Sequence, residues 1–387
     1  MGCWFMPGMG ETPVGLWPPS VSPIPGSLPE TMAGANFMLE TPNRPTLISQ
    51  QAAVSPSMTQ RDGVDSQGRT VLRKTLKRAQ VADFFSNLPH CLVGMEACAS
   101  STYWARVIES CGHTAKRIHP KFVKPYLMAE KNDPNDAEAI CEAVQRPRMR
   151  FVPNKTQEQA DIQAIHRVRR SFVQARTAAI NQVRGLLAEN GIILKQGACH
   201  VRFHLPSIID DHENGLSGTM RQLLRSQYEN ITFLDARIAE QNKVLKDIVK
   251  EHEACRRLMQ IPGVGVLTAS ILLTVAGTVQ DFKNGREFAA YLGLVPRQHS
   301  TGGKRRLLGI SKRGDSYVRT LLIHGGRAVL RAMKMDREPL GDGARNAWLV
   351  SLIDRRGHNR ASVALANRTA RIAWSMLAHG TEYAKAA

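Results

Sequence analysis

The chain has 387 residues, enough for two domains with hydrophobic cores, and a formal net charge of +19 at pH 7. Its seven cysteines include no CxxC pair, which argues against a disulfide framework and a zinc site. No apolar run approaches the ~18 residues of a membrane helix, and no signal peptide is recognisable. We therefore expect a cytoplasmic protein without a membrane partner.

The positive charge is unevenly distributed. Residues 1–60 contain one basic residue, Arg44, and three acidic residues, Glu11, Glu30 and Glu40. The rest of the chain therefore carries the whole positive excess. Such an excess predicts a polyanionic partner, usually nucleic acid. The alternative at this point is a basic protein whose charge serves only solubility.

The chain begins with a proline-rich stretch. Residues 1–56 hold ten of the 20 prolines, and such a composition buries too little apolar surface to fold. We predict a disordered leader over residues 1–60, with order beginning near Gly63.

Strands alternate with helices over residues 61–155, which predicts an α/β domain. A turn at Ser66–Gly68 leads into a strand, RAQVADFFSNL has a helical pattern, and CLVGME is a short apolar strand that ends at Glu96. STYWARVIESCGH then predicts a helix and TAKRIHP a further strand.

The stretch KNDPNDAEAI predicts the start of a helix and raises a question about its acids. Asp133 suits an N-cap, Pro134 the first helical position, and Asp136 the positive end of the helix dipole. Both aspartates could instead bind a metal ion together with Glu96, because hard cations such as Mg²⁺ prefer carboxylate oxygens. The local pattern leaves both interpretations open.

Two long helices are predicted over residues 156–259, one beginning near Thr156 and one running from about Leu216 to Met259. At 1.5 Å per residue each would extend beyond ~50 Å, which favours an antiparallel arm or coiled coil. The first helix has a basic face that includes Arg169 and Arg170. This face either contacts nucleic acid or is solvated surface.

The region 260–380 is predicted to be helical and opens with IPGVG. A helix, this turn and a second helix form a helix-hairpin-helix pattern, in which Gly263 and Gly265 would bring backbone N–H groups close to a phosphate. The alternative is an ordinary corner between two helices.

A loop rich in glycine, serine and cations follows, in GLVPRQHSTGGKRRLLGISKRGD. Its two basic clusters suit contacts with a nucleic-acid backbone: Lys304, Arg305 and Arg306, then Lys312 and Arg313. The chain closes with a helical stretch over residues 346–377.

Several motifs, in order, resemble one family: GMEACAS, NDPNDAEAICEAVQRP, RFVPNKT, NQVRGLLAENGI, IPGVG, GLVPRQHSTGGK and RTLLIHGGRAVL. The chain is similar to the DEDD transposases of bacterial insertion sequences, family one-ten, and most similar to the eleven-eleven subgroup. The resemblance extends from about Gly63 to Leu377.

The resemblance implies an RNase H-like (resolvase-like) domain with a Mg²⁺-binding D-E-D-D tetrad, a helical arm, and a C-terminal domain with a nucleophilic serine. Glu96, Asp133 and Asp136 match the last three tetrad positions, so it favours metal ligands that also cap the helix. It further implies a bacterial cytoplasmic recombinase that acts on DNA with a structured guide RNA. Strand exchange between two DNAs suggests a homodimer or homotetramer.

The family pattern P-x-x-x-x-S-G places the serine near PRQHSTGG. The fifth residue after Pro296 is Thr301, and Ser300 precedes it. We favour Ser300 as the nucleophile, because a primary hydroxyl is less hindered, and keep Thr301 as the alternative. Both hydroxyls could instead cap a turn or bind a phosphate passively.

The chain departs from the family at the first aspartate. The family has a strand of the form V-G-I-D-x-A-K there, and its aspartate would fall at Ala53, but no such stretch exists here. The nearest acids are Glu40, Asp62 and Asp65. We therefore expect the first strand to be absent and recombination to be poor. The rival hypotheses are a nucleic-acid-binding remnant that does not cut and a metal-dependent nuclease that uses water.

Overall fold

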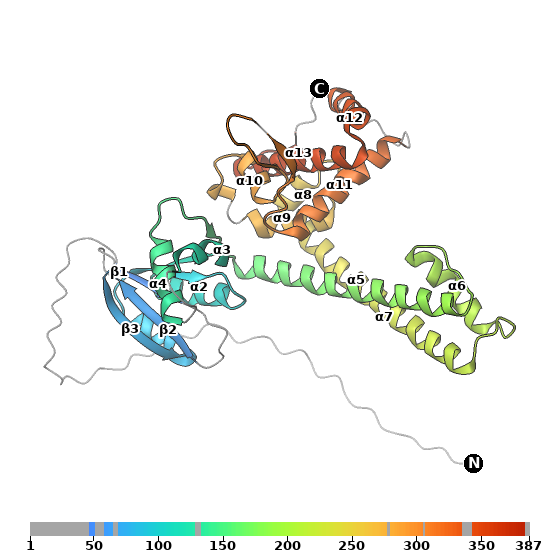
Figure 1. The fold of residues 1–387 in the computed structure, drawn as a ribbon, viewed down its shortest axis with the longest axis horizontal. Coiled ribbons are helices and arrows are strands. Elements are labelled where there is room, and N and C mark those ends of the chain that lie inside the picture. Colours follow the sequence, from blue (N-terminus) through green and yellow to red (C-terminus); the bar gives the residue numbers. More distant parts are fainter. Residues whose placement is uncertain are drawn as a thin grey trace, which may run out of the picture. The chain divides into compact units, whose positions relative to one another are not determined.

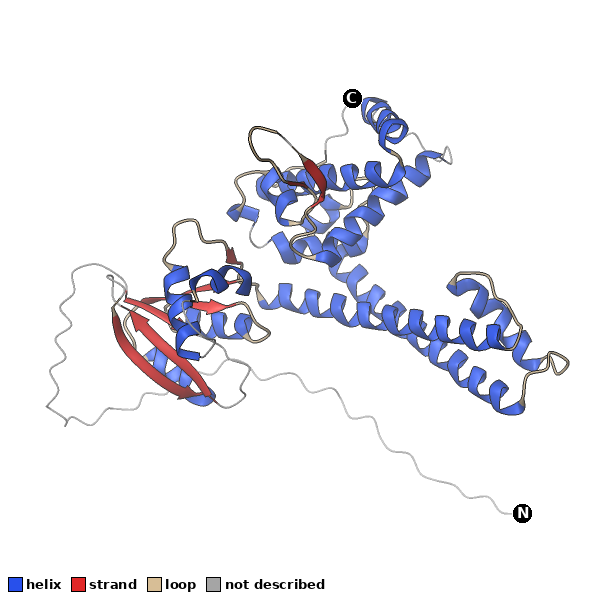
Figure 2. Ribbon diagram, in the orientation of Figure 1, coloured by secondary structure: helices blue, strands red, loops and turns tan. Residues whose placement is uncertain are grey.

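The computed structural model describes residues 46–50, 58–64, 69–127, 133–276, 279–304, 306–334 and 343–383. They belong to one compact unit, Pro45–Ala387. Most of the predicted leader and the turn predicted at Ser66–Gly68 lie outside the described residues. Helices predominate in the described chain, and a small mixed sheet lies near its start (Figure 2).

Six strands form this sheet, in the order β3-β2-β1-β4-β5-β6. β1, β4 and β5 are parallel to one another, whereas β2, β3 and β6 pair antiparallel with their neighbours. The strands are β1 Thr46–Gln50, β2 Met58–Val64, β3 Thr70–Lys77, β4 Cys91–Glu96, β5 Thr114–Ile118 and β6 Phe151–Val152.

The expected loss of the first strand is wrong. β1 lies between β2 and β4, where Ile48 is aligned with Gly63 of β2 and with Val93 of β4. The sheet therefore begins within the predicted leader, residues 1–60. The sequence TLISQ contains Thr, Leu and Ile, which suit a strand, but the proline-rich composition around it concealed the signal.

Helices cover both faces of the sheet. Buried side chains of β4 on one face, including Val93 and Met95, pack with α1 (Val81–Ser86) and α2 (Ser101–Ser110). On the other face, α4 (Asp133–Val144) packs with Leu92 and Ile118. The short elements are η1 Arg78–Gln80, α3 Pro120–Val123 and η2 Lys124–Tyr126.

The predicted arm consists of α5 (Gln157–Glu189) and α7 (Gly218–Glu251), which lie side by side, with α6 (Ala198–Asp210) between them in the chain (Figure 1). Thr156 caps α5: its side chain accepts the N–H of Gln159, whose own side chain returns to the Thr156 backbone. The second predicted helix is interrupted at His252, so that α7 ends and α8 (Glu253–Leu258) begins there.

The remaining helices are α8, α9 Val266–Ala276, η3 Val279–Asp281, α10 Gly285–Tyr291, α11 Ser316–Lys334, α12 Gly343–Arg356 and α13 His358–His379. α8, α9, α10, α11 and α13 surround one hydrophobic core that includes Leu272, Phe288, Leu322 and Ala370. Leu349 of α12 packs in a separate cluster with Leu330 and Leu365. A hairpin of β7 (Pro296–Gln298) and β8 (Leu307–Ile310) lies between α10 and α11 in the chain. Every helix in the described part of the chain is too short or too polar to cross a lipid bilayer.

Candidate functional site

Glu96 is the last residue of β4 and lies at the carboxyl end of that strand. The backbone N–H of Ala97 donates to the carbonyl oxygen of Ile118 in β5 at 2.7 Å, which fixes the chain just after Glu96. Because side chains alternate along a strand, Gly94 and Glu96 share one face of the sheet. Glu96 is half-buried there.

Gly94 allows α4 to approach this face closely. A β-carbon at Gly94 would lie 3.0 Å from Cγ2 of Ile140 and 3.1 Å from Cβ of Val144. Asp136 precedes Ile140 by one helical turn, so it lies on the same side of α4. Asp136 is 7% exposed. The sequence therefore folds so that Asp136 and Glu96 belong to the same side of the sheet.

Asp133 is the first residue of α4, but its side chain is outside the described part of the structure. Among the described side chains, no three His, Cys, Asp or Glu residues converge as a metal site would require. The three-carboxylate site thus stays a prediction. Glu96 and Asp136 nevertheless offer carboxylate oxygens on one face, a donor type that fits a hard divalent cation.

β1 occupies the place of the strand that carries the first aspartate in the family pattern. It contributes no carboxylate, since its sequence is TLISQ. Of the three acids that the sequence offers nearby, Asp62 is in β2, where its backbone is aligned with Ser49 of β1. Glu40 and Asp65 lie outside the described residues. The chain therefore differs from the family pattern by lacking the first carboxylate, whereas the first strand itself is present.

Arg117 of β5 is a structural residue that sequence reasoning missed. It is 4% exposed, and its guanidinium donates to Thr102 Oγ1 at 2.7 Å, to Asn154 Oδ1 at 2.9 Å and to the carbonyl oxygen of Pro153. These bonds attach the segment that precedes α5 to β5 and α2. No local pattern indicates them, because the partners are distant in the sequence.

The candidate nucleophiles lie on the β7–β8 hairpin. Thr301 and Lys304 form a bridge across its tip, and the N–H of Lys304 donates to the carbonyl oxygen of Thr301 at 3.1 Å. Gly302 and Gly303, between them, have φ angles of 55° and 76°. Two consecutive positive φ angles are typical of a tight hairpin turn and favour glycine.

The hydroxyl of Ser300 is exposed but has partners that orient it. Ser300 Oγ accepts a hydrogen bond from Gln298 Nε2 at 3.0 Å and one from the backbone N–H of Arg306 at 3.3 Å. Two donors directed at Oγ would stabilise negative charge that develops on this oxygen. Sequence reasoning missed both partners, because they depend on the register of the hairpin.

One predicted basic cluster lies within this hairpin, and the other follows it in the chain. Lys304 and Arg306 are exposed, while Arg305 lies outside the described residues. Lys312 and Arg313 are also exposed, and their backbone is fixed, because a β-carbon on Gly293 would lie 2.5 Å from the nitrogen of Arg313. Lys312 and Arg313 are therefore exposed to solvent on a backbone segment that is fixed by its packing against Gly293.

The IPGVG turn connects α8 to α9, as a helix-hairpin-helix would require, but Gly263 has another evident role. Its φ is 86°, and a β-carbon on it would lie 2.7 Å from the carbonyl oxygen of Gly325 in α11. Gly265 has no heavy atom within 4 Å of its added β-carbon, and its carbonyl oxygen accepts from Ala269 at the start of α9. Close helix packing thus explains Gly263, and the phosphate role of both glycines stays a prediction.

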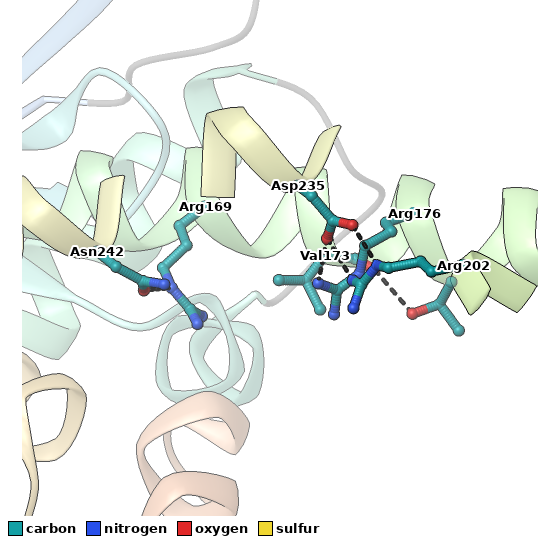
Figure 3. A network of polar contacts seen from close by, with 7 residues as sticks. Arg169, Val173, Arg176, Arg202, Asp235 and Asn242 are labelled. Atoms are coloured by element: carbon teal, nitrogen blue, oxygen red, sulfur yellow. Dashed lines mark hydrogen bonds and ion pairs between the residues drawn. The ribbon is translucent and has the colours of Figure 1, made fainter. Parts of the chain in front are cut away.

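Two predicted nucleic-acid contacts on the arm take part in contacts within the protein. Arg169 Nε donates to Asn242 Oδ1 of α7 at 2.6 Å (Figure 3), and Arg170 lies 5.4 Å from the ring centre of Tyr317. Arg170 is exposed and Arg169 half-buried. Arg170 is therefore the more available of the two for a phosphate.

A carboxylate joins the three arm helices. Figure 3 shows the side chains of Arg176 of α5 and Arg202 of α6 meeting at the carboxylate of Asp235 of α7. Arg176 Nη1 lies 2.8 Å from Asp235 Oδ1, and Arg202 Nε 2.5 Å from Oδ2. Burial alone would raise the pKa of Asp235, but the hydrogen bonds and charges of the two arginines leave it below its usual value. These cations therefore stabilise the arm.

His166 joins the arm to the C-terminal helices. Its Nδ1 lies 3.0 Å from Tyr317 Oη of α11, and its Nε2 lies 3.0 Å from Ser270 Oγ of α9. His166 is 1% exposed, and burial, followed by the charge of Arg169, lowers its pKa to about 4. The imidazole is therefore neutral at pH 7.

Two family models match the chain. A DEDD transposase model of the IS110 group matches residues 62–191, and a model described as "Transposase IS116/IS110/IS902 family" matches residues 255–339. The first match covers the segment from β2 to the end of α5, which includes Glu96 and Asp136. The second covers α9 to α11, which include the hairpin of Ser300.

Relatives with similar sequences extend over most of the chain. A probable family 20 transposase of Pseudomonas aeruginosa is 49% identical over 324 residues, which cover 83% of this chain and 94% of the relative. The transposase for insertion sequence element IS1111A of Coxiella burnetii is 43% identical over 321 residues, or 83% and 87%. The transposase for IS1328 of Yersinia enterocolitica is 39% identical over 321 residues, or 83% and 94%. The chain therefore belongs to the IS110/IS1111 family of insertion-sequence transposases.

Proposed function

We propose that the chain binds DNA and recombines the ends of an insertion sequence by metal-dependent strand cleavage. The observation that carries this proposal is the exposed Ser300 hydroxyl, held by two N–H donors on a glycine hairpin with Lys304 and Arg306 beside it. The cations would hold the phosphodiester, and the hairpin would present the hydroxyl to it.

In the proposed reaction, Ser300 Oγ attacks the phosphorus of a DNA phosphodiester and loses its proton to solvent. The bond to the 3′ oxygen breaks, so the protein becomes joined to the 5′ phosphate, and the departing 3′ oxygen takes a proton from solvent to become a 3′ hydroxyl. The N–H groups of Gln298 and Arg306 would stabilise the alkoxide that forms when Ser300 Oγ loses its proton. Attack of a 3′ hydroxyl on the phosphoserine bond would then complete strand exchange and release Ser300.

A divalent metal is proposed to be held by Glu96, Asp133 and Asp136. The match to the DEDD transposase model supports this proposal. We propose Mg²⁺, which when bound would stabilise charge on the departing 3′ oxygen. In the sheet, β1, β2 and β3 form an antiparallel unit, and β4 and β5 continue it on the other side of β1 as strands parallel to β1. This topology supports an RNase H-like domain. A structured guide RNA and a homodimer or homotetramer complete the proposal, on the strength of the family resemblance.

A covalent protein–DNA adduct tests this mechanism. Wild-type protein, Ser300→Ala and Thr301→Ala are incubated with labelled element-end DNA and Mg²⁺, and adducts are separated under denaturing conditions. We expect an adduct with the wild type and Thr301→Ala but none with Ser300→Ala. If cleavage proceeds without an adduct in all three, the nucleophile is water. Loss of the adduct in Thr301→Ala alone would make Thr301 the nucleophile.

A second candidate function is a transposase that binds nucleic acid but recombines poorly. The observation that favours it is β1, which fills the first-strand position without a carboxylate. With fewer carboxylates, the site would hold its metal more weakly, so the remaining carboxylates would repel one another with less metal to neutralise them. A recombination assay of the unmodified chain separates the two candidates.

A further inference from the structure

An open hollow of about 570 Å³ lies between the start of α10 and one side of α13. Three arginines and a tryptophan line it, and we call it the arginine hollow: Arg286, Arg368, Arg371 and Trp374. None of these four residues belongs to the basic clusters or the hairpin described above.

Close backbone packing forms the hollow. The Asn284 side chain accepts from the backbone N–H groups of Arg286 at 3.0 Å and Glu287 at 3.1 Å, which starts α10 at this point. A β-carbon on Gly285 would lie 2.9 Å from the carbonyl oxygen of Arg371. The backbone of α10 therefore touches α13, and Arg286 and Arg371 come from adjoining segments.

The arginines of α13 share a side of that helix. Arg368 and Arg371 are three residues apart, one turn along the helix. The guanidinium of Arg368 lies 5.6 Å from the ring centre of Trp348 in α12, which limits its movement. The indole N–H of Trp374 donates to the carbonyl oxygen of Val279 at 3.1 Å, so its ring is held at the edge of the hollow.

No carboxylate is among the residues that line the hollow. Within the described residues, neither Arg286 nor Arg371 has a carboxylate within ion-pair distance. α13 contains no Asp or Glu over its 22 residues. The hollow therefore concentrates positive charge beside a helix that has no acid of its own.

We propose that the arginine hollow binds the sugar–phosphate backbone of DNA. Guanidinium groups bind phosphate oxygens through two N–H donors, and a concentration of them attracts a polyanion. Trp374 and Ile372 add an apolar surface against which a sugar or an unstacked base can pack. The inference deepens the proposed function, on which it rests, by assigning DNA contact to a second group of residues.

The test measures how the affinity of the full chain for duplex DNA depends on salt, by fluorescence anisotropy over a range of KCl concentrations. The variant Arg286→Gln/Arg371→Gln is compared with Arg355→Gln/Arg356→Gln, which removes the same charge from exposed positions of α12. The hollow variant should bind DNA at least about tenfold more weakly, and its log–log salt slope should fall by about two. The control should show a much smaller change in both.

The double variant Arg286→Lys/Arg371→Lys should keep most of the salt slope, because it keeps the charge, and circular dichroism checks that each variant is folded. Equal losses in the hollow variant and the control would overturn the inference and leave DNA binding intact. An RNA hairpin is titrated in parallel. If the hollow variant loses affinity for this RNA but not for duplex DNA, the assignment to DNA is overturned. Wild-type protein with an affinity independent of salt would overturn the proposed function as well.

Discussion

Gly263 and Gly325 touch through their backbones, which brings the IPGVG turn directly against α11. A β-carbon on Gly263 would lie 2.7 Å from the carbonyl oxygen of Gly325, and the φ of Gly263 is 86°. Both the close approach and the positive φ exclude a side chain at this position without rearrangement.

Gly263→Ala should therefore lower the free energy of unfolding by about 2–4 kcal/mol. Gly265→Ala is the matched control, because its β-carbon would meet no heavy atom within 4 Å, and it should change stability by less than about 1 kcal/mol. Urea unfolding followed by circular dichroism measures both. Equal stability of the two variants would show that the contact between α11 and the turn is looser than described.

Stability should depend on pH through His166. The folded protein holds the pKa of His166 at about 4, below its ordinary value of 6.5. Between these values the unfolded chain binds a proton at this residue and the folded chain does not, so stability falls as pH falls from 6.5 to 4. The loss should total roughly 3 kcal/mol, with none above pH 6.5.

His166→Gln removes this titration and should flatten that part of the pH profile, measured as the urea midpoint from pH 4 to 8. The groups that face His166 are Ser270, Tyr317, Arg169 and Asp315. His204→Gln, at an exposed position on α6, should keep the wild-type profile. A wild-type profile without a decline below pH 6.5 would contradict a buried neutral imidazole.

Arg117→Met should destabilise the α/β region by about 3 kcal/mol, because it leaves the oxygens of Thr102, Asn154 and Pro153 without their donor. Arg146→Met is a matched control, since Arg146 forms an exposed pair with Glu142, and such pairs contribute less than about 1 kcal/mol. Thermal unfolding of the two variants tests the difference. If both lose the same small amount, the network around Arg117 does not hold the segment before α5.

Recombination should respond to a carboxylate in the first strand. Replacing β1, Thr46–Gln50, with a strand of the form V-G-I-D-x-A-K, while β2 is left in place, should increase Mg²⁺-dependent recombination, because a fourth carboxylate would bind the metal more tightly. The same replacement with Asn in place of Asp is the control and should not. The assay compares both with the unmodified chain, and full activity of the unmodified chain would mean that another acid fills the position.

Local patterns predicted the regular elements well. The strands at CLVGME and TAKRIHP appear as β4 and β5, and the helix that begins after Thr156 appears as α5. These signals depend on neighbouring residues, such as a short apolar run for a strand and apolar residues at helical spacing for a helix. The motifs that indicated the family were equally local, and the comparisons confirmed the family.

Features that depend on distant residues were not predictable. β1 was missed because its short strand signal lies in proline-rich surroundings, and its pairing with β2 and β4 involves residues distant in the sequence. The interruption at His252 has no Gly or Pro to announce it. Likewise, the partners of Ser300 follow from hairpin register, and those of Arg117 from residues up to 37 positions away.

The pairing of β1 shows that the sheet can be complete while a residue that the proposed catalysis needs is missing. Main-chain hydrogen bonds require a β-compatible segment but no particular side chain, so TLISQ can complete the sheet without supplying a carboxylate. A domain of this kind can therefore tolerate replacement of its first strand and still fold. Among copies of such insertion sequences, an intact fold would then be a poor indicator that the copy can transpose. The identity of one residue in the first strand would be a better indicator.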